Sequence, residues 1–169
     1  VAEQYFRDAL SANEDHPVAN NRLVYVLGIQ TRHRELIPYH LRVLRTTPSV
    51  AIKVQLLKNC VELGIPVVSA LGAGGKTDPA QLRIEEIENT HECRLARYVR
   101  KRLHTFGIRK GITVVFSPEK VDAERVIETE KAFPKKSIIG TISYMPAIAG
   151  CMCASVVIRA MYGIPATIE

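Results

Sequence analysis

The chain has 169 residues and a mass of 18.8 kDa, which is enough for one domain with a hydrophobic core. Hydrophobic residues make up 47% and charged residues 24%, so a largely disordered chain is excluded. Lys and Arg number 23 against 17 Asp and Glu, and the net charge of +6 favours an anionic partner. The four cysteines include no Cys-x-x-Cys pair, which argues against a disulfide framework or a zinc site and predicts reduced, cytoplasmic thiols.

The start of the chain and its most apolar segment lack the patterns of targeting and membrane signals. Residues 1–13 are charged and amphipathic, unlike a signal peptide, and the first residue is not Met, which suggests a trimmed or incomplete chain. Residues 138–164 are the most apolar, but Pro146, Gly150 and Arg159 interrupt them, whereas a membrane span has about 20 apolar residues. The sequence therefore predicts a buried core helix there and no membrane association.

The first third of the chain is predicted to contain three helices and one strand. Hydrophobic periodicity and β-branched runs give the order helix 1–12, strand 23–28, helix 34–45 and helix 49–63. The last helix is the best defined, because Val50, Val54 and Leu57 recur at helical spacing between Ser49, a capping residue, and Gly64, a terminating one.

In the remaining two thirds, helices alternate with β-rich strands. The predicted order is strand 65–71, glycine-rich loop 72–79, helix 92–106, strand 112–117, charged exposed segment 118–136 and helix 146–162. Gly107 is expected to end the helix that precedes it. This alternation predicts an α/β fold with helices packed against a sheet.

The glycine-rich loop resembles a phosphate-binding loop. In residues 70–77, Ala-Leu-Gly-Ala-Gly-Gly-Lys-Thr, backbone amides would wrap the phosphates, Lys76 would reach the terminal one and Thr77 would bind Mg²⁺. However, Asp78-Pro79 follows where a helix should begin, and no later strand ends in an Asp suited to Mg²⁺. A flexible strand-to-loop turn is therefore favoured, and a nucleoside triphosphatase using residues 70–77 stays as an alternative.

The helix that follows this loop is strongly basic. Residues 94–110 contain seven Lys or Arg and no acid. An apolar face is expected to hold the helix on the core; its residues are Leu95, Val99, Leu103 and Phe106. The cations expected to project outwards or lie along the rim are Arg97, Arg100, Lys101 and Arg109. Such a face suits an RNA backbone, although pairing with the acids at residues 85–92 is an alternative.

No residue stands out as a nucleophile or as a metal ligand. Cys151 and Cys153 fall on the predicted buried helix with no His near them in sequence, so they are interpreted as inert core thiols. Cys60 is interpreted in the same way on its own helix. The residues alone thus predict a basic α/β domain with a glycine loop, no evident nucleophile and no metal site.

Four blocks of sequence carry a resemblance to a known family. The match begins at Lys53. The four blocks that follow it are residues 64–69 with 72–79, residues 95–103 with 107–108, residues 114–119, and residues 140–146 with 150 and 153–155. In this order, between about Lys53 and Ile158, the chain resembles the tRNA threonylcarbamoyladenosine dehydratases, of the E1-like adenylating superfamily. The resemblance covers about two thirds of the chain and corresponds to the C-terminal half of those enzymes.

The resemblance implies an incomplete, Rossmann-like E1 adenylating fold with helices packed on a mixed sheet. Residues 49–169 would be the E1-like part, and residues 1–48 a divergent or replaced segment. ATP and Mg²⁺ would serve to adenylate a carboxylate on an adenosine of tRNA, and the protein would be a homodimer. The implied nucleotide or substrate loop comprises Lys53, Gly72, Gly74, Gly75, Lys76 and Asp78. The implied tRNA-binding residues are Arg97, Arg100, Lys101 and Arg102.

The chain departs from the family where the nucleotide would bind. The Gly-x-Gly-Gly-x-Gly turn that opens the family's fold is absent, and residues 46–50 replace a segment that normally carries an Asp. Cys93-Arg94 stands where many members have Asp-Pro. A non-catalytic domain that keeps the tRNA-binding or dimer-forming surface is therefore an alternative to the dehydratase, and turnover by this chain alone is not expected.

Overall fold

The computed structural model describes residues 2–16, 19, 35, 38–39, 49–121, 126–128 and 137–164. It divides the chain into two compact units, the first made of Val1–Val67 with Thr105–Ile108 and the second of Val68–His104 with Arg109–Glu169. The predicted strand 23–28 and most of the predicted helix 34–45 lie outside the described residues.

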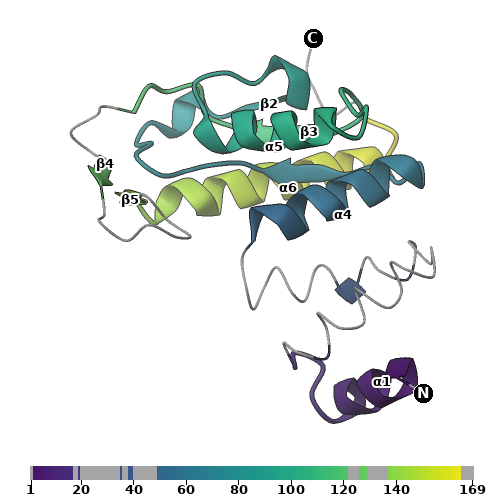
Figure 1. Ribbon diagram of the computed structural model, residues 1–169. Helices are drawn as coiled ribbons and strands as arrows, with labels where there is room; N and C mark the ends of the chain where they lie inside the picture. Colours follow the sequence, from purple (N-terminus) through teal and green to yellow (C-terminus); the bar gives the residue numbers. More distant parts are fainter. Residues whose placement is uncertain are drawn as a thin grey trace. The chain divides into compact units, whose positions relative to one another are not determined.

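The first unit begins with helix α1 (Ala2–Ala12), which confirms the first predicted helix (Figure 1). Arg7 on this helix donates hydrogen bonds to the Tyr39 hydroxyl at 2.8 Å and to the Glu35 carboxylate at 3.1 Å. Leu10 is buried on the same helix. These contacts tie α1 to residues some thirty positions further along the chain.

Helix α4 (Val50–Glu62) confirms the best-defined prediction of the first third. Ser49 is at the N-cap with extended backbone, although its hydroxyl makes no capping hydrogen bond. Gly64 has a φ of +64°, in the left-handed region that favours glycine. The Ile65 N–H then donates to the Cys60 carbonyl at 2.8 Å, which satisfies a free carbonyl at the helix end.

The second unit is built on a three-stranded mixed sheet of order β1-β3-β2. Strand β1 (Val68–Ala70) runs parallel to β3 (Thr113–Phe116), whereas β2 (Arg83–Glu86) runs antiparallel to β3. The sheet confirms the predicted α/β class. Strand β2 was not predicted, because only Ile84 of its four residues is hydrophobic; such charged strands are typical of sheet edges.

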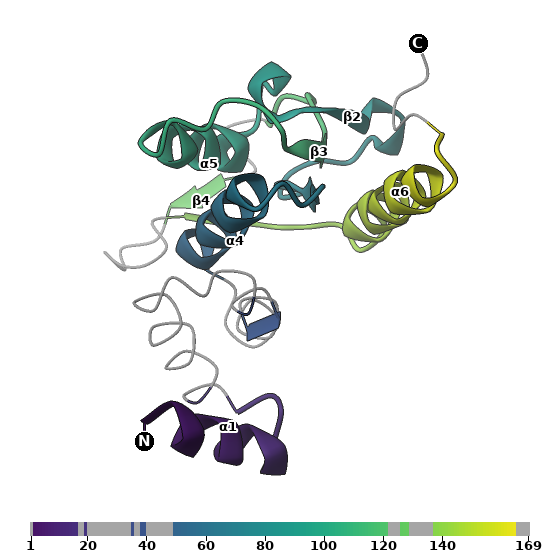
Figure 2. The ribbon, with the colours of Figure 1, turned by 90° about the vertical axis from the view of Figure 1, so that its right-hand side faces the viewer.

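Helices α5 (Arg94–His104) and α6 (Tyr144–Met161) lie on opposite sides of this sheet (Figures 1 and 2). The central strand is covered on both faces, and Val114, Val115 and Phe116 are buried. Helix α5 buries Val99 and Leu103, as its periodicity predicts, together with Ala96, whereas Leu95 of the predicted face is only half-buried. Phe106, which the same periodicity assigned to this face, is instead 48% exposed and lies beyond the end of the helix.

The prediction that the last helix is a buried core element is wrong. Helix α6 contacts β1 and β3, but only 17% of it is buried, through residues such as Met145, Ala149 and Val156. Within the described residues it is the one helix long and apolar enough, by length and composition, to cross a membrane. A helix that is apolar all round has no amphipathic stripe, so its sequence predicted burial on every side, and the sheet covers only one.

The cysteine predictions are confirmed for one helix and wrong for the other. All four cysteines are free thiols, as expected. Cys60 on α4 is buried, which confirms its interpretation as a core residue. Cys151 is exposed and Cys153 half-buried, because α6 itself is mostly exposed.

A small two-stranded sheet completes the described part of the second unit. Strand β4 (Val126–Glu128) pairs antiparallel with β5 (Ser137–Ile139), with Val126 opposite Ile139. Strand β4 falls inside the segment 118–136, for which a charged, exposed stretch was predicted. Residues 122–125 and 129–136 of that segment lie outside the described part of the chain.

Candidate functional site: an anchored glycine loop beside a basic helix

The glycine-rich loop leaves the end of β1 and is anchored at several points. The Leu71 N–H donates to the Val115 carbonyl at 2.9 Å, so the β1–β3 ladder extends to the first residue before the loop. The Gly75 N–H donates to the Gly140 carbonyl at 2.8 Å, and the Tyr144 hydroxyl donates to the Thr77 carbonyl at 2.7 Å. The loop predicted at 72–79 is therefore present, but it is held against the start of α6 rather than free.

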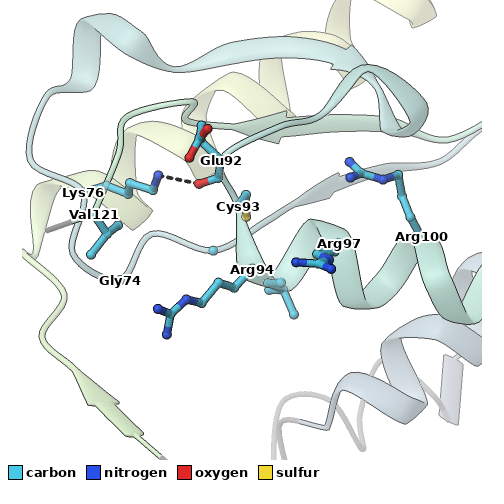
Figure 3. Close-up of a pocket in the computed structure, with 10 residues that line it drawn as sticks. Gly74, Lys76, Glu92, Cys93, Arg94, Arg97, Arg100 and Val121 are labelled. Atoms are coloured by element: carbon cyan, nitrogen blue, oxygen red, sulfur yellow. Dashed lines mark hydrogen bonds between the residues drawn. The ribbon is translucent and has the colours of Figure 1, made fainter. Parts of the chain in front are cut away.

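Lys76 is the central anchor of the loop and is only 3% exposed. Its ammonium donates to the Glu92 carbonyl at 3.0 Å (Figure 3) and also to the Glu119 carbonyl. Burial lowers the pKa of Lys76, against the opposing influence of nearby Cys93, Glu119 and Glu92. Because both carbonyls already hold this ammonium, Lys76 does not extend towards a phosphate.

The amides that a phosphate-binding loop would offer are occupied by a carboxylate of the protein itself. Glu119 accepts hydrogen bonds from the Thr77 N–H at 2.8 Å, the Thr77 hydroxyl at 2.9 Å and the Asp78 N–H at 2.9 Å. Partial burial opposes ionisation of Glu119, but the amides of Asp78 and Thr77 outweigh it and hold the pKa of this carboxyl below its ordinary value. Glu119 therefore stands where a phosphate would bind.

The segment after the loop also differs from that of a nucleotide-binding loop. It forms the three-residue 3₁₀-helix η1 (Pro79–Gln81), in which Asp78 caps the Ala80 N–H at 2.9 Å, and it then enters β2. Between the loop and β2, where every residue is described, no α-helix directs its N-terminus at a phosphate. Together with the buried Lys76, this geometry shows that the phosphate-loop alternative is wrong.

Glu119→Gln is expected to lower the free energy of unfolding by about 1 kcal/mol near neutral pH, because the amide side chain loses the charge-assisted bonds. The folded pKa of Glu119 is depressed, so its stabilisation is present above the ordinary glutamate pKa and is lost as pH falls through the folded value. The difference between the proteins should therefore vanish below about pH 4. Thermal melting across pH measures this.

Glu88→Gln is the matched control for that measurement, because Glu88 only pairs with the exposed Lys110 at 3.2 Å. It should change stability little at any pH. A deficit of Glu119→Gln that stayed constant from neutral to acid pH would contradict the role assigned to the Glu119 carboxylate.

A cavity of about 580 Å³ lies between the glycine loop and the start of α5 (Figure 3). Gly72 and Gly74 line it from the loop, Cys93 and Arg97 from the helix side, and Val121 from the segment after β3. A Cβ on Gly72 would meet the Leu95 Cβ at 3.4 Å and the Cys93 sulfur at 3.5 Å, which are ordinary van der Waals contacts. A second cavity of about 360 Å³ is lined by residues 75–77 and 140–142.

Three cations of the basic helix face solvent without an acidic partner among the described residues. Arg94, Arg97 and Lys101 are all exposed, and no described carboxylate forms an ion pair with them. Of the acids at 85–92, Glu86 accepts the N–H groups of residues 111 and 112, and Glu88 forms an ion pair with Lys110 at 3.2 Å. Ion pairing with those acids therefore accounts for Lys110 but not for Arg94, Arg97 and Lys101.

Arg100 and Arg102 differ from these three cations. Arg100 is half-buried, and its guanidinium donates to the Thr90 hydroxyl and carbonyl, which fixes the segment before α5. Arg102 donates to the Tyr98 hydroxyl at 3.0 Å and lies 5.4 Å from the centre of that ring. Outward projection is thus confirmed for Arg97, Lys101 and also Arg109, which is exposed, but Arg100 is partly buried.

The predicted nucleotide or substrate residues are distributed over both units. Gly72, Gly74 and Lys76 line the larger cavity, and Gly75 lines the smaller one. Asp78 is a capping residue that also accepts from the Gln81 side chain at 3.0 Å. Lys53 lies half-buried on α4 in the first unit, and its role stays a prediction.

The roles of Glu119 and Cys93 have no indication in the sequence. Glu119 contacts Thr77 across 42 positions of sequence, and no local pattern marks such a pair. Cys93 precedes α5, and its sulfur accepts the Ala96 N–H at 3.4 Å. Among the described residues, no group of three or more His, Cys, Asp or Glu side chains is arranged to hold a metal ion.

Similar proteins give this geometry a context, although no protein-family model matches the chain. The tRNA threonylcarbamoyladenosine dehydratase of Bacillus subtilis is 32% identical over 115 residues, which are 64% of this chain and 45% of that protein. The dehydratase 2 of Saccharomyces cerevisiae is 43% identical over 77 residues, 46% of this chain and 17% of that one. The Escherichia coli dehydratase TcdA, solved with ATP, is 28% identical with a TM-score of 0.56, covering 68% of this chain and 45% of TcdA.

The mixed sheet with helices on both faces is therefore an incomplete, Rossmann-like fold of the E1-like adenylating class. The matched part of the chain is similar in sequence and in structure to the tRNA threonylcarbamoyladenosine dehydratases. The chain spans less than half the length of the Bacillus subtilis and yeast relatives.

Proposed function

We propose that this chain supplies the tRNA-facing part of an ATP-dependent dehydratase that cyclises N6-threonylcarbamoyladenosine in tRNA. Its relatives carry that name in bacteria and yeast, and the Escherichia coli relative has been solved with ATP and with AMP. The observation that carries the proposal for this chain is the exposed basic face of α5, with Arg97 and Lys101 free of acidic partners among the described residues.

The proposed reaction needs no nucleophile from the protein. A carboxylate oxygen of the threonylcarbamoyl group attacks the α-phosphate of ATP, and pyrophosphate leaves. A second atom of the same substrate group then attacks the activated carbonyl carbon, and AMP departs with the original carboxylate oxygen. The net change in the nucleoside is the loss of one water. Positioning and charge stabilisation carry such a reaction, which agrees with the absence of an evident nucleophile in the sequence.

The cations of α5 divide into two roles under this proposal. Arg97 and Lys101 bind phosphodiesters of tRNA directly, as exposed charges with no acidic partner in the described part of the chain. Arg102, placed over the Tyr98 ring, offers a flat guanidinium on which a base can stack. Arg100 is a positioning residue, because its hydrogen bonds to Thr90 hold the start of the helix.

ATP and Mg²⁺ are proposed as cofactors of the whole enzyme. The described residues fit neither group well, because Lys76 is buried, Glu119 fills the amides of the loop and no described carboxylate cluster suits a cation. Lys53, Gly72, Gly74, Gly75 and Asp78 remain proposed to border the nucleotide or substrate. We assign no chemical step to Mg²⁺ in this chain.

Assembly and location are part of the same proposal. The exposed apolar side of α6, which includes Val157, Ile158 and Met161, supports association with another E1-like part or with a second copy as a homodimer. The free thiols and a tRNA substrate support a cytoplasmic protein without membrane association, in which residues 1–48 are a divergent segment. A non-catalytic tRNA-binding or dimer-forming domain is a second candidate, favoured by the glycine loop, whose lysine and amides are engaged by the protein itself.

Calorimetry with MgATP, with and without tRNA, tests the proposed function. We expect tRNA to bind and MgATP to give no saturable heat with this chain alone. Micromolar binding of MgATP would contradict the assignment of the chain as the tRNA-facing part and would indicate a nucleotide site within it. Absence of tRNA binding would contradict the proposal as a whole.

A further inference from the structure

The larger cavity has the size and the charge of a nucleotide pocket. Its volume of about 580 Å³ lies within the range of small-molecule sites. Its lining includes four cations, Lys76, Arg94, Arg97 and Arg100, and a single acid, Glu92. A cavity so lined suits an anionic ligand.

The positive charge available to a ligand is concentrated on one side of the cavity. Lys76 already donates to two carbonyls, and Arg100 already donates to Thr90. Arg94 and Arg97 are exposed, and Figure 3 shows both at the start of α5, with the Arg100 side chain further along the helix. Two arginine side chains are thus left to meet an anion at the mouth of the cavity.

Apart from Lys76, which is engaged by two carbonyls, the inner walls carry no charge. Gly72 and Gly74 present backbone rather than side chains, and the sulfur of Cys93, which is 8% exposed, lies against the loop. The hydrogen bonds of Lys76 and Glu119 hold the loop that forms this wall. The cavity is therefore preformed, which lowers the ordering cost of binding.

We infer that this cavity receives one nucleotide extruded from a single-stranded RNA loop, with Arg94 and Arg97 binding its anionic groups at the mouth. Enzymes that act on a base commonly take it out of the stack into a pocket, and RNA loops present unstacked bases readily. The inference rests on the proposed function and deepens it, since it identifies the pocket for the target adenosine. Phosphodiesters and the threonylcarbamoyl carboxylate are the anions that would meet the arginines.

Cys93 provides a reporter inside the cavity. The rate of its alkylation by iodoacetamide, followed by peptide mass spectrometry, is measured with and without a short single-stranded RNA that carries the threonylcarbamoyl group on one adenosine. Cys151, exposed on α6, is the internal control. Bound RNA should slow the reaction of Cys93 about tenfold and leave Cys151 unchanged. Arg94→Ala with Arg97→Ala should abolish the protection.

Val121→Phe is a second test that does not depend on the reactivity of Cys93, because the larger side chain narrows the cavity and removes none of its cations. It should weaken RNA binding about tenfold in fluorescence anisotropy, whereas Ala51→Phe, at an exposed position of α4 with no assigned role, should not.

RNA that binds without protecting Cys93 and with unchanged affinity for Val121→Phe would overturn the inference and leave the proposed function standing. Equal protection by inorganic phosphate would also overturn it, because the cavity would then be a general anion site. A complete lack of RNA binding would instead refute the proposed function.

Discussion

Replacing Lys76 by methionine is expected to destabilise the second unit and to cause no specific loss of nucleotide binding. The substitution keeps the volume of the side chain but leaves the carbonyls of Glu92 and Glu119 without their donor. Each buried acceptor left unsatisfied costs about 1–3 kcal/mol, and removal of a buried ammonium offsets part of this. The net loss should be about 2 kcal/mol, or about 4–8 °C in melting temperature.

Urea and thermal unfolding measure this loss, and Lys120→Met is the matched control. Lys120 is exposed, so its replacement should change stability by less than about 0.5 kcal/mol. A Lys76→Met protein as stable as the wild type would contradict the anchoring role of this ammonium. If it had also lost an affinity for MgATP, the phosphate-loop alternative would have to be restored.

Reversing the charge at Arg97 and Lys101 together is expected to weaken tRNA binding at least about tenfold. Both side chains are exposed on α5 without an acidic partner among the described residues, so the substitutions to Glu remove two cations that face phosphates and add repulsion. The slope of log affinity against log salt concentration should also become shallower, by about 0.7–0.9 for each phosphate that is no longer neutralised.

Titrations at several salt concentrations, followed by fluorescence anisotropy, test this expectation. Arg83→Glu is the control, because Arg83 is an exposed cation on strand β2 rather than on the basic helix. It should weaken tRNA binding much less than the double variant. Equal losses for both proteins would mean that only net charge matters and that the face of α5 has no special role.

The elements with strong local signals could be predicted from the sequence. Helix α5 has an apolar stripe ended by Gly107, which has a φ of +76°, and β3 is a β-branched run buried on both faces. Strand β2 could not be predicted in this way. Charged residues such as Glu85 and Glu86 are common in edge strands, but they do not distinguish a strand from a loop in the sequence.

The interior of the site depends on contacts between distant residues. Glu119 holds the amides of residues 77 and 78, and Lys76 bonds to the carbonyl of Glu92, which has a φ of +48° that few residues other than glycine adopt. Neither contact has a local sequence signature. The glycine motif therefore suggested a phosphate-binding loop, whereas the tertiary contacts make it a rigid wall of a cavity.

The exposure of α6 illustrates a different limit of sequence reasoning. Residues such as Ile158 and Met161 indicate that the helix should be buried, but they do not indicate which surface would cover it. Two strands of the sheet contact it on one side only, and the chain spans less than half of its Bacillus subtilis relative. Hydrophobic composition thus predicted a requirement for burial that this chain alone does not meet.

The central claim is tested most directly by the affinity of this chain for tRNA that carries the threonylcarbamoyl group. The affinity is measured without ATP and is compared with that for an unmodified transcript of the same tRNA. The proposal predicts micromolar binding that weakens steeply with salt and is tighter for the modified tRNA. Absence of binding at low salt, or equal affinity for any double-stranded nucleic acid, would contradict it.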